Sequence, residues 1–373
     1  MTKSALDLDL SDWKIWAQEH NFPRYLAKQI YQWIFHKNSL NPSYFTNLSL
    51  PIREKLSTSF YWELFTIDSH LISSDKSKKI LLKTRDNLLV EMMLMPYDKR
   101  ITLCISSQVG CKMGCTFCQT GKMGFKRNLS TGEILAQIHL ANSILQQGEG
   151  GKKVTNVVFM GMGEPLDNYE AVIKACRTII HPDGFGLSKS RVTLSTAGVV
   201  PQIRKLAQDL PVCLAVSLHA ASDVKRSKMM PINRRYSLEE LKKALLDYAG
   251  PSRKSVTFEY VLIEGVNDSI KDAKDLVRYL HGFKAKVNLI PINHFPGLEM
   301  RPSETERIRA FQSYLSARSI PCPVRYSRGQ DVSGGCGQLA AKRKEEVLHD
   351  PRTVHRRKRL LSRVKSSKVE SQA

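Results

Sequence analysis

The chain has 373 residues and a formal net charge of +22, with an isoelectric point near 9.7. Hydrophobic residues make up 42% of it and charged residues 25%, which is typical of a globular protein with a sizeable core. There is no apolar run as long as a membrane span and no secretory signal at the N-terminus, so we expect a cytoplasmic protein. The positive charge favours a polyanionic partner, with nucleic acid as the first candidate and an anionic membrane surface as the second.

Residues 1–60 are predicted to form a small helical accessory domain. Ser11 and Asp12 are candidate N-cap residues for a helix that runs through Trp13 and Trp16. A second helix is predicted from apolar residues at helical spacing, namely Leu26, Ile30, Trp33 and Ile34.

Residues 61–100 are predicted to form an extended β segment that leads into the core. We expect Lys76, Lys78 and Lys79 to lie in a polar turn of this segment. The stretch 87–96 is extended and apolar apart from Glu91.

From residue 101 to about 341 the pattern alternates between strands and helices. Short β-rich runs occur at 101–106, 154–161, 191–196, 212–218, 256–263 and 286–292. Helical stretches are predicted at about 131–147, 168–180, 200–208, 237–249, 269–281 and 303–317. Six successive strand–helix units indicate an α/β fold with a parallel sheet, either open or curled toward a barrel. In such folds the chemistry gathers at the carboxyl ends of the strands.

The most informative stretch of the chain is the glycine-rich loop after the first of these strands. Cys111, Cys115 and Cys118 have the spacing C-x3-C-x2-C, with the aromatic Phe117 before the last cysteine. Three thiolates on one loop can bind three irons of a four-iron cluster and leave the fourth iron open to a ligand. A structural zinc site would need a fourth ligand and usually a second cysteine pair, which is missing here. Three unpaired core cysteines would not suit so polar and glycine-rich a loop.

Several predicted strands end in small or polar residues. Gly163 and Glu164 follow the strand at 154–161, and the glycine lets the backbone approach a ligand closely. The next ends carry Ser195, then Ser217, Leu218 and His219, and finally Asn293. We expect His219 to contact a ligand and not to transfer protons, because an isolated histidine is more often a satisfied hydrogen-bonding group.

Of the eight cysteines, two further ones need an explanation. Cys104 lies on the first core strand, and Cys336 lies in a Gly-Gly-Cys-Gly loop after a final strand predicted at Pro323 to Ser327. A free surface thiol is the alternative for Cys336, but a loop that can reach the mouth of a barrel favours chemistry. The others, Cys176, Cys213 and Cys322, are interpreted as structural.

Residues 342–373 are predicted to form a basic, mobile tail. They carry eleven Lys and Arg against four Asp and Glu, a net charge of +7. Binding to RNA phosphates and simple solubilisation explain this tail equally well.

The cysteine spacing resembles the signature of radical S-adenosylmethionine (SAM) enzymes. More narrowly, the stretch from Gln108 to Leu129 resembles the RlmN/Cfr family of RNA adenine methyltransferases. The likeness covers essentially residues 10–345, and further family-like blocks are 191–196, Met230-Pro-Ile-Asn233 and 288–297. It implies a partial (β/α)6 barrel in which Cys111, Cys115 and Cys118 bind a four-iron cluster. It also implies that SAM is held by Gly163, Glu164, Ser195, Ser217, the main chain of Leu218, His219 and Asn293.

The resemblance further implies a mechanism with two molecules of SAM per turnover. Cys336 takes a methyl group from the first, and the second supplies a 5′-deoxyadenosyl radical that activates this methyl for addition to the adenine ring. Glu91 matches the family's proton acceptor. Cys104 then attacks the sulfur of Cys336 and releases the product, leaving a disulfide for an external dithiol reductant, while an external electron donor serves the cluster.

The His-Phe-Pro-Gly after Asn293 and the long N-terminal unit are more RlmN-like than Cfr-like, which implies methylation of carbon 2 of adenosine. The implied substrates are 23S rRNA, at the peptidyl-transferase centre, and tRNA, at the adenosine just 3′ of the anticodon. Three alternatives stay open: carbon-8 methylation, a radical SAM enzyme with a substrate other than RNA, and a non-enzymatic, metal-stabilised RNA-binding module. The loop 331–336 departs from the family, which commonly has alanines before the cysteine. We expect a monomer that does not bind membranes.

Overall fold

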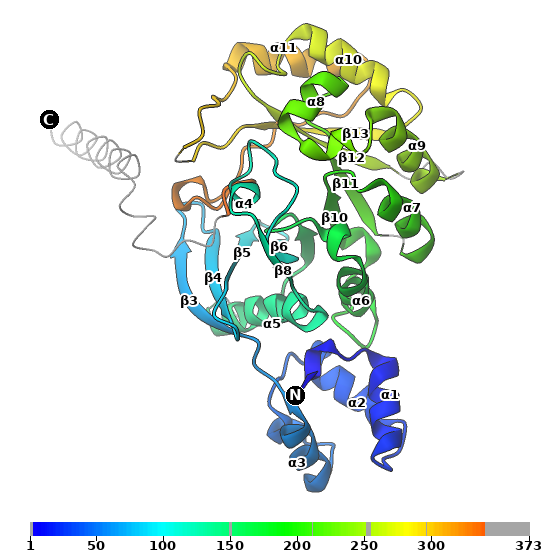
Figure 1. Ribbon diagram of the computed structural model, residues 1–373. Helices are drawn as coiled ribbons and strands as arrows, with labels where there is room; N and C mark the ends of the chain where they lie inside the picture. Colours follow the sequence, from blue (N-terminus) through cyan, green and yellow to red (C-terminus); the bar gives the residue numbers. More distant parts are fainter. Residues whose placement is uncertain (1–2, 149–150, 211, 251–254, 296, 340–373) are drawn as a thin grey trace, which may run out of the picture.

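The computed structural model describes residues 3–148, 151–210, 212–250, 255–295 and 297–339 (Figure 1). Its main element is a nine-stranded sheet with the order β13-β12-β11-β10-β9-β6-β5-β4-β3. The strands from β13 to β6 are parallel, whereas β5, β4 and β3 continue the same sheet in antiparallel pairing. The predicted basic tail 342–373 lies outside the described residues.

The six parallel strands and their helices confirm the predicted strand–helix alternation. The strands are β6 (Ile101–Cys104), β9 (Asn156–Phe159), β10 (Val192–Thr196), β11 (Cys213–Ser217), β12 (Val256–Leu262) and β13 (Ala285–Pro291). The helices between and after them are α5 (Thr131–Gly148), α6 (Tyr169–Ile180), α7 (Val200–Asp209), α9 (Leu238–Ala249), α10 (Ile270–Leu280) and α11 (Thr305–Ser316). The fold is therefore α/β with a partial, open barrel.

Side-chain alternation separates the two faces of this sheet. In β10, Val192 and Leu194 are fully buried in the core that the helices share, whereas Thr193 and Ser195 line pockets on the opposite face. The helices thus cover the outer face (Figure 1), and the inner face is left for the site. Short elements join the strands: α4 (Gln119–Lys122), η4 (Pro165–Asn168), η5 (Lys189–Arg191), α8 (Asp223–Met229), η6 (Pro231–Arg234) and η7 (Gln330–Val332).

The N-terminal region is helical, as predicted. It contains β1 (Lys3–Ser4), η1 (Ala5–Asp7), α1 (Leu10–Glu19), α2 (Leu26–Tyr31), the π-helix η2 (Gln32–His36), η3 (Pro42–Tyr44), α3 (Leu50–Ser59) and β2 (Phe60–Tyr61). The predicted N-cap was wrong by two to three residues. Asp9 caps α1, because its carboxylate accepts from the N–H groups of Ser11 and Asp12 at 2.8 and 2.9 Å.

The β segment before the core forms the antiparallel part of the sheet. Its strands are β3 (Phe65–Ile72), β4 (Lys78–Thr84) and β5 (Leu89–Pro96). Placing Lys78 and Lys79 in a turn was wrong, because both belong to β4 and only Lys76 lies in the turn before it. Lys79 is buried, with 4% of its surface exposed.

The predicted final strand at Pro323–Ser327 was also wrong. This segment runs beside β13 but forms only one bridge, between Leu289 and Val324. Pro321 and Pro323 have no N–H group to donate, so they cannot contribute fully to a ladder. Among the described residues, no helix is both long and apolar enough to cross a bilayer.

Candidate active site

A short two-stranded ribbon holds both ends of the cysteine loop. β7 (Gln108–Gly110) pairs with β8 (Phe125–Asn128), and the N–H of Cys111 donates to the carbonyl of Gly124 at 3.0 Å. Gly110 has a φ of +74°, and a Cβ there would lie 1.8 Å from the oxygen of Gly124. Only glycine fits this close approach, so the local sequence fixes the start of the loop.

The three loop cysteines line one pocket of about 170 Å³. Within the described part of the chain, no three Cys, His, Asp or Glu side chains converge on one metal-ion position. Three thiols that line one pocket suit the cluster predicted from their spacing, in which each thiolate binds a different iron atom.

Burial controls the protonation of these thiols. It raises the pKa of Cys111 to about 12, and it also raises the pKa of Cys115 and of Cys118. Three such thiols would stay protonated near neutral pH without a positive partner. The irons of a cluster supply that positive charge and stabilise the thiolates, so the donor set suits the group.

Gly163 and Glu164 form the wall beside the cysteine loop. A Cβ at Gly163 would lie 2.6 Å from the side chain of Gln108, so the loop and this strand end approach too closely for another residue. The Glu164 carboxylate accepts from the N–H groups of Ala197 and Leu166 at 2.7 and 3.0 Å. Burial raises the pKa of Glu164 to about 7, and these two hydrogen bonds oppose the rise. The carboxylate is thus placed to accept from an ammonium group.

The other predicted SAM-binding residues mostly meet at this pocket. Its lining includes Ser195, Ser217, His219 and Asn293. Leu218 does not line it: its N–H donates to the carbonyl of Glu259, and its carbonyl accepts from Arg226. The ligand contact predicted for the main chain of Leu218 stays a prediction.

His219 is held as a neutral side chain. Its Nδ1 accepts from the N–H of Val261 at 3.0 Å, and its ring packs edge-to-face on Phe117 at 4.7 Å. Burial and the nearby Arg226 lower the pKa of His219 to about 3. With Nδ1 occupied, the ring can donate only through Nε2–H, which suits contact with a ligand.

Sequence reasoning missed Arg226, which organises these strand ends. Its guanidinium donates to the carbonyls of Ala197 at 2.7 Å and of Ser217 and Leu218 at 3.1 Å each. It also donates to Asn233 at 2.9 Å, and only 1% of its surface is exposed. Arg226 was missed because an arginine on a helix usually faces solvent. The family-like block Met230–Asn233, which contains its partner Asn233, was the only nearby sequence signal.

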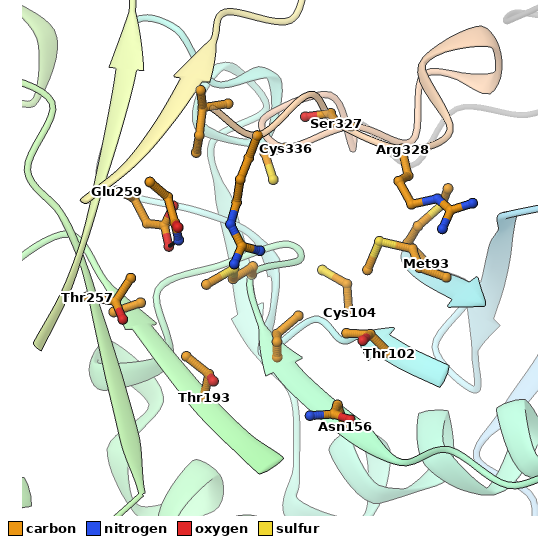
Figure 2. Close-up of a pocket in the computed structure, with 18 of the residues that line it drawn as sticks. Met93, Thr102, Cys104, Asn156, Thr193, Thr257, Glu259, Ser327, Arg328 and Cys336 are labelled. Carbon is orange, nitrogen blue, oxygen red and sulfur yellow. Dashed lines mark hydrogen bonds between the residues drawn. The ribbon is translucent and has the colours of Figure 1, made fainter. Parts of the chain in front are cut away.

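A second pocket, of about 340 Å³, lies along the inner face of the sheet, toward the amino ends of the strands, where Asn156, Thr193 and Lys286 line it. Cys104 and Cys336 lie on facing sides of it (Figure 2). Both are free thiols. Cys336 also lines the first pocket, so this thiol stands where the two pockets meet.

Neither thiol of the second pocket is easily ionised. Cys336 is exposed at its loop, but the protein around its sulfur raises the pKa of the thiol to about 11, with a further contribution from the negative charge of Glu259. Burial also raises the pKa of Cys104, and Cys336 adds to this effect. Accepting a methyl group requires the Cys336 thiolate, but in this arrangement the thiol is mostly protonated near neutral pH. A positively charged methyl donor beside it would favour the thiolate.

Glu259 is a second residue that sequence reasoning missed. It lines both pockets, is 7% exposed and accepts from the amide of Asn288 at 2.7 Å. Burial raises its pKa. It lies inside an apolar strand, and no motif marked it.

The segment that carries Cys336 is fixed at both ends. Arg328 donates to the carboxylate of Asp75 in the β3–β4 turn at 3.0 Å and to the carbonyl of Pro96 at 2.6 Å. Asn293 donates to the carbonyl of Cys336 at 3.0 Å, and Gln119 donates to that of Gly337 at 2.7 Å. Figure 1 shows this segment, in orange, beside α4 and above β3 and β4. The loop of Cys336 is thus tied to both pockets.

Glu91 lies on β5 and is fully buried. It lines neither pocket, but Met93 and Met95, which share its face of the strand, line the second one. Its carboxylate forms an ion pair with Lys79, with 2.9 Å between Nζ and Oε1. The structure therefore places Glu91 beside the second pocket and behind its lining residues.

These features define a class of protein: a radical SAM enzyme whose cluster pocket opens onto a pair of cysteines. Residues 105–278 match the profile of the Radical SAM superfamily, and residues 4–61 match the N-terminal domain of ribosomal RNA large subunit methyltransferases. A radical SAM methyltransferase from Sphaerobacter thermophilus has a similar structure, with a TM-score of 0.87 and 42% identity. That match covers 91% of this chain and all of the other.

Relatives narrow the class to one family. A dual-specificity RNA methyltransferase RlmN from Campylobacter hominis is 46% identical over 92% of this chain and 98% of its own length. One from Syntrophobacter fumaroxidans is 43% identical over 90% and 97%. The chain belongs to the RlmN family. It is a radical SAM methyltransferase that uses a four-iron cluster and SAM.

Proposed function

We propose that this enzyme methylates carbon 2 of adenosine in 23S rRNA, at the peptidyl-transferase centre, and in tRNA, just 3′ of the anticodon. The family membership and the net charge of +22 support an RNA substrate. The observation that carries the mechanism is the position of Cys336, which lines both the cluster pocket and the second pocket. A methyl group on this sulfur can face the cofactor on one side and a nucleobase on the other.

The residues of the first pocket bind and orient SAM. Cys111, Cys115 and Cys118 hold the cluster, and Glu164 accepts from the amino group of SAM. The bound cofactors supply the radical that removes a hydrogen atom from the methyl group. Apolar lining residues such as Phe117 and Val261 limit the water beside that radical and so its side reactions.

The residues of the second pocket carry the methyl group and release it. Cys336 receives the methyl group from a first SAM and becomes bonded through it to carbon 2 of the base. Glu91, which lies behind the lining of this pocket, accepts the proton of that ring carbon. Cys104 then attacks the sulfur of Cys336: an S–S bond forms, the S–C bond breaks with its electron pair going to the methylene carbon, and this carbon takes up a proton, so that a methyl group leaves with the RNA.

Two external partners complete the cycle. An electron donor reduces the cluster, and a dithiol reduces the disulfide between Cys104 and Cys336. We place this reaction in the cytoplasm, with the enzyme working as a monomer.

The test is nucleoside mass spectrometry after reaction of the anaerobically reconstituted protein with each RNA. We expect 2-methyladenosine from both RNAs and a Cys336 peptide that is heavier by one methyl group. Cys336→Ala should form no methyladenosine. Formation of 8-methyladenosine would contradict methylation at carbon 2. Methyladenosine formed by Cys336→Ala would contradict the role of Cys336 as the methyl carrier.

A further inference from the structure

The ion pair between Lys79 and Glu91 lies in the interior of the sheet. Lys79 is 4% exposed and Glu91 is not exposed at all, and 2.9 Å separate Nζ from Oε1. Lys79 lies on β4 opposite Met93, two residue pairs along the β4–β5 ladder from Glu91 and on the same face. The two charges therefore meet on the face of the sheet that carries the pocket-lining residues Met93 and Met95.

Stability alone does not explain such a pair. Removing two charges from water is costly, and well-packed apolar residues in their place often give a protein that is as stable or more so. Elsewhere on these strands, Leu81, Leu82 and Leu94 show that the sheet accommodates apolar side chains. A buried pair at this position therefore points to a need for charge there.

A third contact joins the pair to the segment of Cys336. The Lys79 ammonium also donates to the carbonyl of Ser333 at 3.3 Å. Ser333 has a φ of +52° and lies three residues before Cys336. One ammonium thus contacts both the carboxylate assigned to proton removal and the segment that carries the methylated cysteine.

We propose that Lys79 is a positioning residue for proton removal, an inference that rests on the proposed function. Its ammonium, 2.9 Å from Glu91 Oε1 and 3.3 Å from the carbonyl of Ser333, holds the carboxylate close to the segment of Cys336. In the step it supports, the C–H bond at the ring carbon breaks, the proton passes to a Glu91 oxygen, and the electron pair of that bond stays in the ring. Without Lys79, the methylene-linked RNA–protein adduct forms but does not lose its proton.

The test compares Lys79→Met, Lys79→Arg and Glu91→Gln in cluster-loaded protein with SAM and RNA. Lys83→Met is the matched control, because Lys83 lies on the same strand at its partly exposed end. Lys79→Met should lower methyladenosine formation at least about tenfold, which is the order expected when a general base is disabled. The RNA–protein adduct should rise from a trace to the main species on a denaturing gel, and Cys336 should still be methylated.

Glu91→Gln should trap the same adduct, and Lys79→Met combined with Glu91→Gln should be no worse than Glu91→Gln alone. Lys79→Arg, which keeps the charge, should restore part of the product, and Lys83→Met should behave like the unmodified protein. The double variant also buries no unpaired charge, so it remains informative if Lys79→Met unfolds. A lower product yield with Lys79→Met but no adduct would overturn the inference. If Glu91→Gln traps no adduct either, the role of Glu91 in the proposed function fails instead.

Discussion

The two pockets of this enzyme are built in different ways. The cluster pocket takes its three cysteines from one loop and most of its other residues from successive carboxyl ends of parallel strands, with Cys336 and Gly337 added from the C-terminal segment. The second pocket depends on contacts between distant segments, such as Arg328 with Asp75, which are 253 positions apart. The cluster pocket is thus determined mainly by local sequence. The second pocket forms only when the antiparallel strands and the C-terminal segment come together.

The largest contrast is expected between one cysteine of each pocket. Cys118→Ala should lose the cluster and all methylation, because only two protein thiolates would remain. Cys104→Ala should keep the cluster and trap RNA on Cys336, because nothing attacks that sulfur to release the product. Iron and sulfide analysis together with a denaturing gel would measure both. Equal loss of iron in the two variants, or free RNA after reaction of Cys104→Ala, would contradict the assignment of cluster binding to one pocket and product release to the other.

Glu164→Gln should weaken SAM binding by about tenfold or more, because a charged hydrogen bond to the SAM ammonium is replaced by a neutral one. Anaerobic equilibrium binding of SAM would measure the change. Glu170→Gln is a suitable control, since Glu170 is exposed and pairs only with Lys205 on the surface among the ion pairs described for it. Unchanged SAM affinity in Glu164→Gln would show that this carboxylate does not contact the cofactor.

Arg328→Met should slow the methylation of Cys336 by about tenfold, the scale of effect when a reacting group loses its position. SAM affinity should not change, because Arg328 lines only the second of the two pockets. The Cys336 peptide can be followed by mass spectrometry before RNA is added, so lost RNA contacts do not affect the result. Arg318→Met, at an exposed helix end, serves as the control. A normal rate of Cys336 methylation would show that the hydrogen bonds of Arg328 to Asp75 and Pro96 are not needed to position Cys336.

The smallest effect concerns the scaffold beneath both pockets. His139 on α5 is buried against Phe35 and Phe185, and neither ring nitrogen has a hydrogen-bond partner among the described residues. Burial lowers its pKa to about 3, so between this value and about 6.5 the unfolded chain binds the extra proton. The free energy of unfolding should therefore fall as the pH falls through this window, and less steeply in His139→Leu.

Urea unfolding at pH 7 and pH 5 would measure this difference. His70→Leu, at an exposed position on β3, is the control and should keep the original pH dependence. If His139→Leu and the unmodified protein lost stability equally between the two pH values, His139 would not be buried in its neutral form.

The sequence predicted the parts of the site that local pattern determines. Strand and helix periodicity placed β10 and α6 to within about a residue, and the spacing of Cys111, Cys115 and Cys118 indicated the cluster loop. It could not predict the burial of Arg226, Glu259 or Lys79, because charged residues are usually exposed and only tertiary contacts reveal their partners. Lys79 was even assigned to a turn, since a run of lysines resembles a solvated segment.

The most direct test of the central claim, that the methyl group passes through Cys336 as a radical, uses SAM with a fully deuterated methyl group. A hydrogen atom is removed from the Cys336 methyl before the new carbon–carbon bond forms. The account therefore predicts that the methyl group of the product keeps two of its three deuterium atoms. Product that keeps all three would show direct transfer from SAM and would contradict the account.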